Sequence, residues 1–188
     1  MKVVAILGSP RKKGNSARLA RRVLAAAEAQ GAETEVYLLN AMKYKGCQGC
    51  NSCKTETDFC VVKDDLTPVY ESIRRAEVLV LASPVYFGDL SGQMKCFFDR
   101  FYAYFDNDFH SRLQPGKKSV TILTQGDPQE SSFDDIFPRY ERWLKLFGFE
   151  RNYLLRAVGV REEGEVNSKT EVLRRAEEIG GEIVRNSE

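Results

Sequence analysis

The sequence contains only one histidine, no long apolar run and no excess of charge of either sign. Every apolar stretch is far shorter than the roughly 18 residues that a membrane-spanning helix requires. The 28 basic and 27 acidic side chains leave a net charge of +1, so we expect no general affinity for nucleic acids or membrane surfaces. The histidine, His110, lies in a stretch rich in Phe and Asp without a nucleophile motif such as G-x-S-x-G. A serine or cysteine hydrolase is therefore not indicated.

A chain of 188 residues with 43% apolar and 29% charged residues is typical of a folded protein, and we expect a single domain over residues 1–188. The first apolar run ends at Gly8 and is not followed by a small-residue cleavage site. No export signal is expected, and the predicted location is the cytoplasm. Four of the five cysteines fall within 14 residues. In a reducing compartment such a cluster indicates a metal site or a redox-active site before it indicates disulfides.

Apolar runs alternate with amphipathic segments along the chain, which predicts a three-layer α/β sandwich with a parallel sheet. Two of the runs, at residues 3–7 and 78–82, contain no polar residue, as expected for strands buried on both faces. Further strands are predicted at residues 34–39, 119–124 and 153–158. Helices are predicted before Gly31 and at residues 66–75, 92–104, 133–146 and 168–185. The last helix is expected to open with a capping box of Ser168 and Glu171.

The turn after the first predicted strand, residues 8–16, joins a buried strand to a helix. Free N–H groups at the start of a helix, together with hydroxyls and Arg11, suit a phosphate or another oxyanion. Five residues separate Gly8 from Gly14, one more than in a Walker A loop, and Asn15 stands where that loop has its lysine. The dinucleotide fingerprint G-x-G-x-x-G is also missing. On this loop alone, a polar surface turn capped by Asn15 or Ser16 is an alternative.

Two segments, GSPRKKGNS at residues 8–16 and SPVYFGDLSGQMKCFFDR at residues 83–100, resemble the NAD(P)H-dependent FMN reductase family of flavodoxin-like proteins. The resemblance covers most of the chain and weakens after about Gln129. It implies a flavodoxin-like sandwich with a five-stranded parallel sheet in the order 2-1-3-4-5. It also implies an FMN-dependent enzyme with NAD(P)H as a substrate.

The same resemblance implies that FMN lies against three loops at the ends of predicted strands. The first loop would hold the phosphate, and the second would lie along the flavin ring, where an aromatic side chain supplies an apolar edge and a glycine allows close approach. The third would complete the site after the fourth predicted strand. The residues implied are Ser9, Arg11, Gly14, Asn15 and Ser16 in the first loop, Pro84, Val85, Tyr86, Phe87 and Gly88 in the second, and Thr124, Gln125, Gly126 and Asp127 in the third.

Cys47, Cys50, Cys53 and Cys60 form the pattern C-x2-C-x2-C-x6-C. Three thiolates at two-residue spacing, with a fourth nearby, resemble the ligand run of a [4Fe–4S] cluster. Within the FMN reductase family, this pattern resembles the iron-sulfur flavoproteins. Reduced thiols or a CxxC redox pair are an alternative, and a zinc site, which more often has two separated pairs, is another. Cys96 lies in an apolar helix and is expected to be a buried thiol rather than a ligand.

The leading hypothesis is an FMN oxidoreductase of the iron-sulfur flavoprotein type. Electrons would pass between NAD(P)H or a reduced carrier and an acceptor, which is either a small molecule or a redox carrier protein. Without a cluster, the same scaffold would reduce a quinone, a nitro compound or free flavin. A non-enzymatic carrier like flavodoxin is a second hypothesis, against which the near-zero net charge counts. A third is a structural module whose cysteines hold a metal only to pin a loop.

A dense run of aromatic residues predicts that the chain forms an oligomer. One helix turns only about a 100° stripe toward the core, so part of a dense aromatic run is expected to remain exposed. Monomers seldom expose a large apolar patch, and the run therefore predicts a homodimer or homotetramer with the flavin near a subunit boundary. The run has seven aromatic residues within 13 positions: Phe97, Phe98, Phe101, Tyr102, Tyr104, Phe105 and Phe109.

Overall fold

The computed structural model describes residues 1–185, so the last three residues of the predicted domain lie outside the described part. Its sheet has five parallel strands: β1 (Lys2–Leu7), β2 (Glu33–Leu38), β3 (Val78–Tyr86), β5 (Lys117–Thr124) and β6 (Phe149–Ala157). Their spatial order is β2-β1-β3-β5-β6. This is the order 2-1-3-4-5 of the flavodoxin-like sandwich, and the predicted fold is confirmed. A short strand, β4 (Asp89–Leu90), pairs antiparallel with the end of β3.

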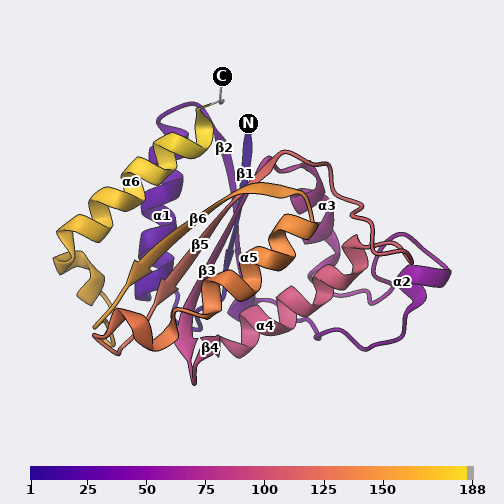
Figure 1. Cartoon of the computed structure of the whole chain (residues 1–188), viewed down its shortest axis with the longest axis horizontal. Coiled ribbons are helices and arrows are strands. Elements are labelled where there is room, and N and C mark those ends of the chain that lie inside the picture. The colour runs from indigo at the N-terminus through magenta and orange to yellow at the C-terminus, as the bar shows by residue number, and fades with distance from the viewer. Residues whose placement is uncertain (186–188) are drawn as a thin grey trace.

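Helices cover both faces of the sheet (Figure 1). On one face lie α1 (Asn15–Glu28) and α6 (Thr170–Val184), and on the other lie α3 (Thr67–Arg75), α4 (Gly92–Asp99) and α5 (Ile136–Leu146). A long connection between β2 and α3 carries the one-turn helix α2 (Ser52–Thr55), which lies at the edge of the molecule, away from the sheet. Within the described residues, no helix has the length and apolar character needed to cross a membrane.

The apolar central strands divide their side chains between two cores. Val4 and Ile6 of β1 join the core under α3, α4 and α5, whereas Val3, Ala5 and Leu7 join the core under α1 and α6. This division explains why the first and third apolar runs lack polar residues, because alternate side chains point to opposite faces and both faces are covered. Because β1, β3 and β5 are parallel, their carboxyl ends meet at one edge of the sheet. The loops predicted to bind FMN begin at this edge.

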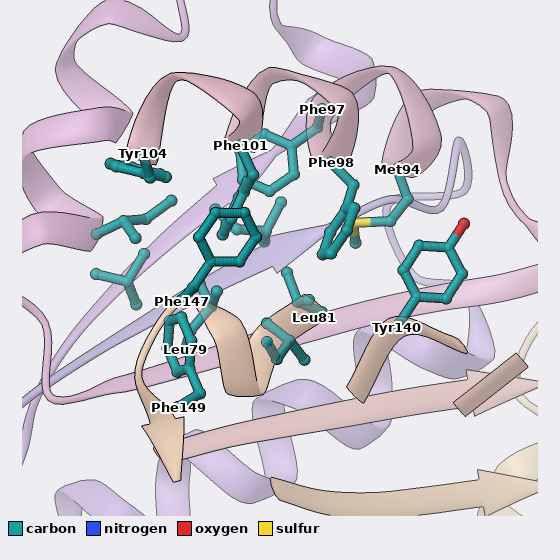
Figure 2. Close-up of a cluster of buried hydrophobic side chains, with 14 of the residues drawn as sticks. Leu79, Leu81, Met94, Phe97, Phe98, Phe101, Tyr104, Tyr140, Phe147 and Phe149 are labelled. Atoms are coloured by element: carbon teal, nitrogen blue, oxygen red, sulfur yellow. The ribbon is translucent and has the colours of Figure 1, made fainter. Parts of the chain in front are cut away.

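Most of the aromatic run is buried inside the chain. Figure 2 shows Phe97, Phe98, Phe101 and Tyr104 pointing from α4 and its extension toward Leu79 of β3 and the α5–β6 segment. The extension is a 3₁₀ helix, η2 (Arg100–Tyr104), in which residues three apart share a face. Phe98, Phe101 and Tyr104 therefore all face the core, where the Phe98 and Phe101 rings stack at 5.1 Å. Of the seven aromatic residues only Phe109 is strongly exposed, at 60%. The prediction that a large part of the aromatic run remains exposed was therefore largely wrong.

Two predicted helix starts differ in detail. The capping box at Ser168 and Glu171 does not form, because Ser168 lies in a preceding 3₁₀ turn and its hydroxyl donates to the Glu165 carbonyl. Glu171 instead pairs with Arg174. At the start of α1, the N-cap is Gly14 and not Asn15 or Ser16. Both changes leave the helices at their predicted places in the fold.

Candidate functional site

The loop after β1 has the features of an anion cradle. Gly14 caps α1 without a side-chain hydrogen bond, so the N–H groups of the first turn keep no side-chain partner. Ser9 and Ser16 are buried beneath the loop, and among the described residues the Ser16 hydroxyl is a buried polar atom without a hydrogen-bond partner. A Cβ at Gly14 would approach the Ser9 hydroxyl to 2.9 Å. The loop therefore has unsatisfied donors at a helix N-terminus and no room for a larger residue, which fits a phosphate group.

The Asn15 side chain makes long-range hydrogen bonds in addition to its predicted place in the phosphate loop. Its Nδ2 donates to the Glu162 carbonyl (2.9 Å), and its Oδ1 accepts from the N–H groups of Gly164 (3.0 Å) and Val166 (3.3 Å). The amide therefore anchors the segment 161–166 beside the cradle. The backbone N–H of Asn15 and the second hydrogen of its Nδ2 are left for a phosphate. Residues 161–167 are charged and contain a glycine, and such a pattern carries no signal of this long-range contact.

Arginines stand at the rim of the cradle. Arg11 is exposed, and its Nη1 donates to the Arg161 carbonyl at 2.7 Å. Arg161 in turn donates from Nε to the Gly126 carbonyl at 3.3 Å. Arg161 thus joins the first loop to the third, a role that the sequence did not suggest. Either guanidinium can add charge-assisted hydrogen bonds to an anion bound in the cradle.

The second loop is a tight hairpin between β3 and β4. Phe87 and Gly88 both have positive φ angles, 48° and 80°, as in a two-residue type I′ turn. A bulky residue in this conformation is uncommon, and such strain is often found at functional sites. Phe87 is fully exposed and Tyr86 is 44% exposed, while Pro84 and Val85 are half-buried. The hairpin thus presents aromatic side chains at the edge of the sheet where the flavin ring is expected.

Hydrogen bonds fix the first two loops to each other. Ser91, the N-cap of α4, donates its hydroxyl to the Gly8 carbonyl at 2.7 Å and its backbone N–H to the Ser83 hydroxyl at 2.9 Å. A Cβ at Gly8 would approach the Met94 Cβ to 2.7 Å, so α4 packs directly on the first loop. The start of α4 therefore holds both loops in register.

The third loop follows β5 at its carboxyl end. Thr124 and Gln125 are buried, and the Gln125 Nε2 donates to the carbonyls of Asp127 (3.2 Å) and Gln129 (2.8 Å). Its Oε1 is buried without a partner in the described chain. The structure thus brings all three predicted loops to one edge of the sheet. Whether each named residue contacts FMN stays a prediction.

All four clustered cysteines line one small cavity in the long β2–α3 connection, together with Arg100 and Tyr102. Cys53 is buried, Cys60 is half-buried, and Cys47 and Cys50 are exposed. The cavity measures about 20 Å³, close to the space of a single water molecule, so a cluster would require the loop to open around it. Four thiols around one cavity nevertheless form the donor set that an iron-sulfur cluster needs.

A single metal ion and a cluster would hold the four sulfurs differently. A tetrahedral ion would hold its sulfur ligands in contact with one another. In the described chain, no three His, Cys, Asp or Glu side chains lie close enough together to hold one ion. In a four-iron cluster each thiolate binds a different iron, so the sulfurs lie farther apart. A single ion and a cluster therefore require different spacings of the four sulfurs.

Basic residues fasten the cysteine loop to the body of the protein. Lys54 donates to the carbonyls of Tyr102 and Phe105, and its ammonium group lies 3.8 Å from the centre of the Tyr102 ring. Arg112 donates from Nη1 to the carbonyls of Cys53 (2.8 Å) and Ala103 (2.9 Å). These cations also place positive charge beside thiolates or a cluster, both of which are negative.

Arg100 clamps both ends of the loop. It is 1% exposed, and its Nη1 donates to the Lys45 carbonyl at 2.7 Å and to Asp64 Oδ2 at 2.8 Å, while Nη2 donates to the Val62 carbonyl at 3.2 Å. Burial tends to raise the pKa of Asp64, but hydrogen bonds from Arg100 and backbone N–H groups lower it overall. Because the two partners lie 36 positions apart, no local sequence pattern identifies this ion pair.

Two further side chains, Cys96 and His110, lie at the surface. Cys96 was predicted to be buried but is exposed on α4, because the core-facing positions of this helix are Met94, Phe97 and Phe98. It lies outside the cavity that the other four cysteines line. His110 is exposed, and among residues 1–185 its hydrogen-bond partner is Asp106 of the same loop, as expected of a surface residue.

Comparisons with known proteins identify the family of the chain. Residues 1–129 match the family of NADPH-dependent FMN reductases. An iron-sulfur flavoprotein of Methanosarcina thermophila is 37% identical over 148 residues, which cover 79% of this chain and 75% of that protein. One of Archaeoglobus fulgidus is 32% identical over 186 residues, covering 97% of this chain and 79% of that protein.

Solved structures show the same fold at low sequence identity. An NAD(P)H:quinone oxidoreductase from Methanothermobacter marburgensis superposes with a TM-score of 0.76 at 18% identity, covering 100% of this chain and 99% of that one. An FMN-dependent NADH-azoreductase from Bacillus anthracis, solved in complex with FMN, gives a TM-score of 0.72 at 13% identity, covering 98% and 100%. On the family match and the two close relatives, the chain belongs to the NADPH-dependent FMN reductase family, a family of FMN-binding oxidoreductases.

Proposed function

We propose that the chain is an FMN-dependent NAD(P)H oxidoreductase that also carries a [4Fe–4S] cluster on Cys47, Cys50, Cys53 and Cys60. The observation that carries this proposal is the lining of a single cavity by all four cysteines. The names of the two relatives described above support the same assignment. The acceptor would be a small molecule or a redox carrier protein.

Each flavin-site loop has a separate task in this proposal. The first loop binds the phosphate through the first-turn N–H groups of α1, the Ser9 and Ser16 hydroxyls, and Arg11. The second loop orients the ring against the Tyr86–Gly88 hairpin, and the third closes the site with Gln125. Bound FMN supplies the hydride and electron chemistry, so the protein needs no acid or base of its own.

Helix α4 connects the two proposed centres. Its first residues follow Ser91, which holds the first two flavin loops, and its last turn leads into Arg100, which holds the cysteine loop. With eight residues, α4 is about 12 Å long. Helix α4 thus joins the segments that would hold the two centres.

The test is to purify the protein without oxygen and to measure FMN and iron per chain. The expected result is one FMN and about four iron atoms, with broad visible absorbance. Cys53→Ser should lose the iron and keep the FMN, and the matched control Cys96→Ser should keep both. FMN without iron after reconstitution would contradict the cluster and favour a cluster-free reductase. Absence of FMN would contradict the enzyme itself.

We also propose that the chain forms a homodimer or homotetramer. A groove of about 700 Å³ lies between the α4–η2 segment and α5, and Phe109 and Trp143 line its rim at 60% and 46% exposure. Leu146, 54% exposed, extends the apolar surface along α5. These residues, and not the buried part of the aromatic run, now support an apolar contact between copies.

A further inference from the structure

The hairpin between β3 and β4 has a conformation that it would not hold by itself. It consists of only two residue pairs, and the pair that closes the turn is Tyr86 with Asp89. A two-stranded hairpin is marginally stable at best in water, and backbone strain of this kind is kept only where the surroundings enforce it. Phe87 carries the strain at a φ of 48°, and its fully exposed side chain gains no burial to offset it. The turn therefore needs an anchor elsewhere in the chain.

The carboxylate of Asp89, directly after this turn, forms such an anchor. Its Oδ1 accepts the Tyr140 hydroxyl at 2.9 Å and the backbone N–H of Leu90 at 2.7 Å. Its Oδ2 accepts from Arg139 Nη1 at 3.2 Å. Arg139 and Tyr140 are consecutive residues of α5, so one carboxylate joins the hairpin to a helix that follows it by 50 positions in the chain.

Tyr140 is itself held firmly in the core. It is 5% exposed, and its ring packs edge-on against the Phe98 ring with 4.9 Å between their centres. Figure 2 shows the Tyr140 hydroxyl pointing away from the apolar side chains of this core. Burial raises the pKa of the Tyr140 phenol, and the hydrogen bond to Asp89 raises it further. The phenol therefore keeps its proton at neutral pH and is the donor to the carboxylate.

We propose that Asp89 is a positioning residue of the flavin site, and that its bonds to α5 fix the aromatic turn of the hairpin against the flavin ring. This inference rests on the proposed function, because it requires the Tyr86–Gly88 turn to contact the ring. Asp89 acts on the flavin only through the hairpin. Reaction rates depend steeply on geometry, and a misplacement of about 1 Å can cost about a hundredfold. A loosened turn should therefore slow the reaction more than it weakens FMN binding, since the first loop would still hold the phosphate.

The main test compares Asp89→Ala with Asp135→Ala in the FMN-loaded protein. Asp135 is the matched control, because it also pairs with Arg139, at 3.0 Å, but lies at the start of α5 and not in the hairpin. The quantities measured are the FMN dissociation constant, the fluorescence of bound FMN and the rate of flavin reduction by NAD(P)H in a single turnover. In Asp89→Ala we expect a nearly unchanged dissociation constant, brighter bound FMN because an aromatic ring held against the flavin quenches it, and reduction slowed about tenfold. Asp135→Ala should match the wild type in all three.

Two milder variants complete the design. Tyr140→Phe removes one donor and keeps its ring in the core, and Asp89→Asn keeps the oxygen that accepts from Tyr140 and Leu90. Both should lie between the wild type and Asp89→Ala in fluorescence and rate. Wild-type fluorescence and reduction rate in Asp89→Ala would overturn the inference, and so would equal changes in Asp135→Ala. A wild type that binds FMN but does not oxidise NAD(P)H would overturn the proposed function, and the fluorescence comparison would still decide the inference.

Discussion

Asp64→Asn tests the clamp that shapes the cysteine loop. Asp64 accepts from Arg100 Nη1 at 2.8 Å, and its carboxylate also accepts the backbone N–H groups of Lys45 (3.2 Å) and Leu66 (3.1 Å). The side chains of Arg100 and Asp64 are only 1% and 10% exposed. An asparagine has the same shape, but it lacks the charge and has one acceptor oxygen instead of two.

The expected loss of stability is large, because the change leaves a buried guanidinium without its counter-charge. Removing one partner of a buried ion pair typically costs about 3–5 kcal/mol. We expect a loss of about 3 kcal/mol at neutral pH, since Arg100 keeps its two carbonyl acceptors. The assay is urea unfolding followed by circular dichroism. Asp65→Asn is the matched control, because Asp65 is exposed and bonds to the backbone N–H of Lys43.

The effect should also depend on pH. The pKa of Asp64 is lowered in the folded protein, so its contribution is complete above the unfolded value, about 3.9, and is lost as pH falls through the lower folded value. The stability gap between wild type and Asp64→Asn should be constant from about pH 5 to 8 and should close in acid. A loss below about 1 kcal/mol at neutral pH, or a gap that persists in strong acid, would refute the reasoning.

Three other predictions concern the flavin site and the assembly. Arg11→Ala should weaken FMN binding about tenfold or more and leave riboflavin binding nearly unchanged, because a charge-assisted phosphate contact contributes roughly 1.5–3 kcal/mol; equal losses in two fluorescence titrations would contradict it. Asn15→Ala should weaken both ligands and lower thermal stability, because it frees the segment 161–166, and an unchanged melting temperature would contradict that role. Phe109→Lys with Trp143→Lys should reduce the oligomer to about 21 kDa by light scattering, and a wild-type mass near 21 kDa would remove the oligomer proposal.

The sequence predicted the parts of the fold that depend on local pattern. The uninterrupted apolar runs of β1 and β3 identified central strands, since only a sheet covered on both faces buries such runs. The burial of the aromatic run could not be predicted in this way. The burial of these side chains depends on the change from α to 3₁₀ geometry at Arg100, which brings Phe98, Phe101 and Tyr104 to one face.

For the candidate site as well, local patterns could be predicted from the sequence and long-range contacts could not. The glycine loop and the cysteine spacing are local signals, and these segments follow β1 and β2 in the structure. The contacts that hold these segments are not local. Asn15 bonds to residues almost 150 positions away, and Arg100 to residues 36 to 55 positions away. Such partners are chosen by the folded topology, so a single sequence offers no means to pair them.

The most direct test of the account is an anaerobic titration that counts the electrons one loaded chain accepts. FMN takes two electrons and a [4Fe–4S] cluster takes one. With NAD(P)H as the donor and a low-potential reductant to complete the titration, the wild type should take up three electrons per FMN. Cys53→Ser should take up two, while Cys96→Ser should match the wild type. Two electrons in the wild type, or three in Cys53→Ser, would contradict a flavin and a cysteine-held cluster in the same chain.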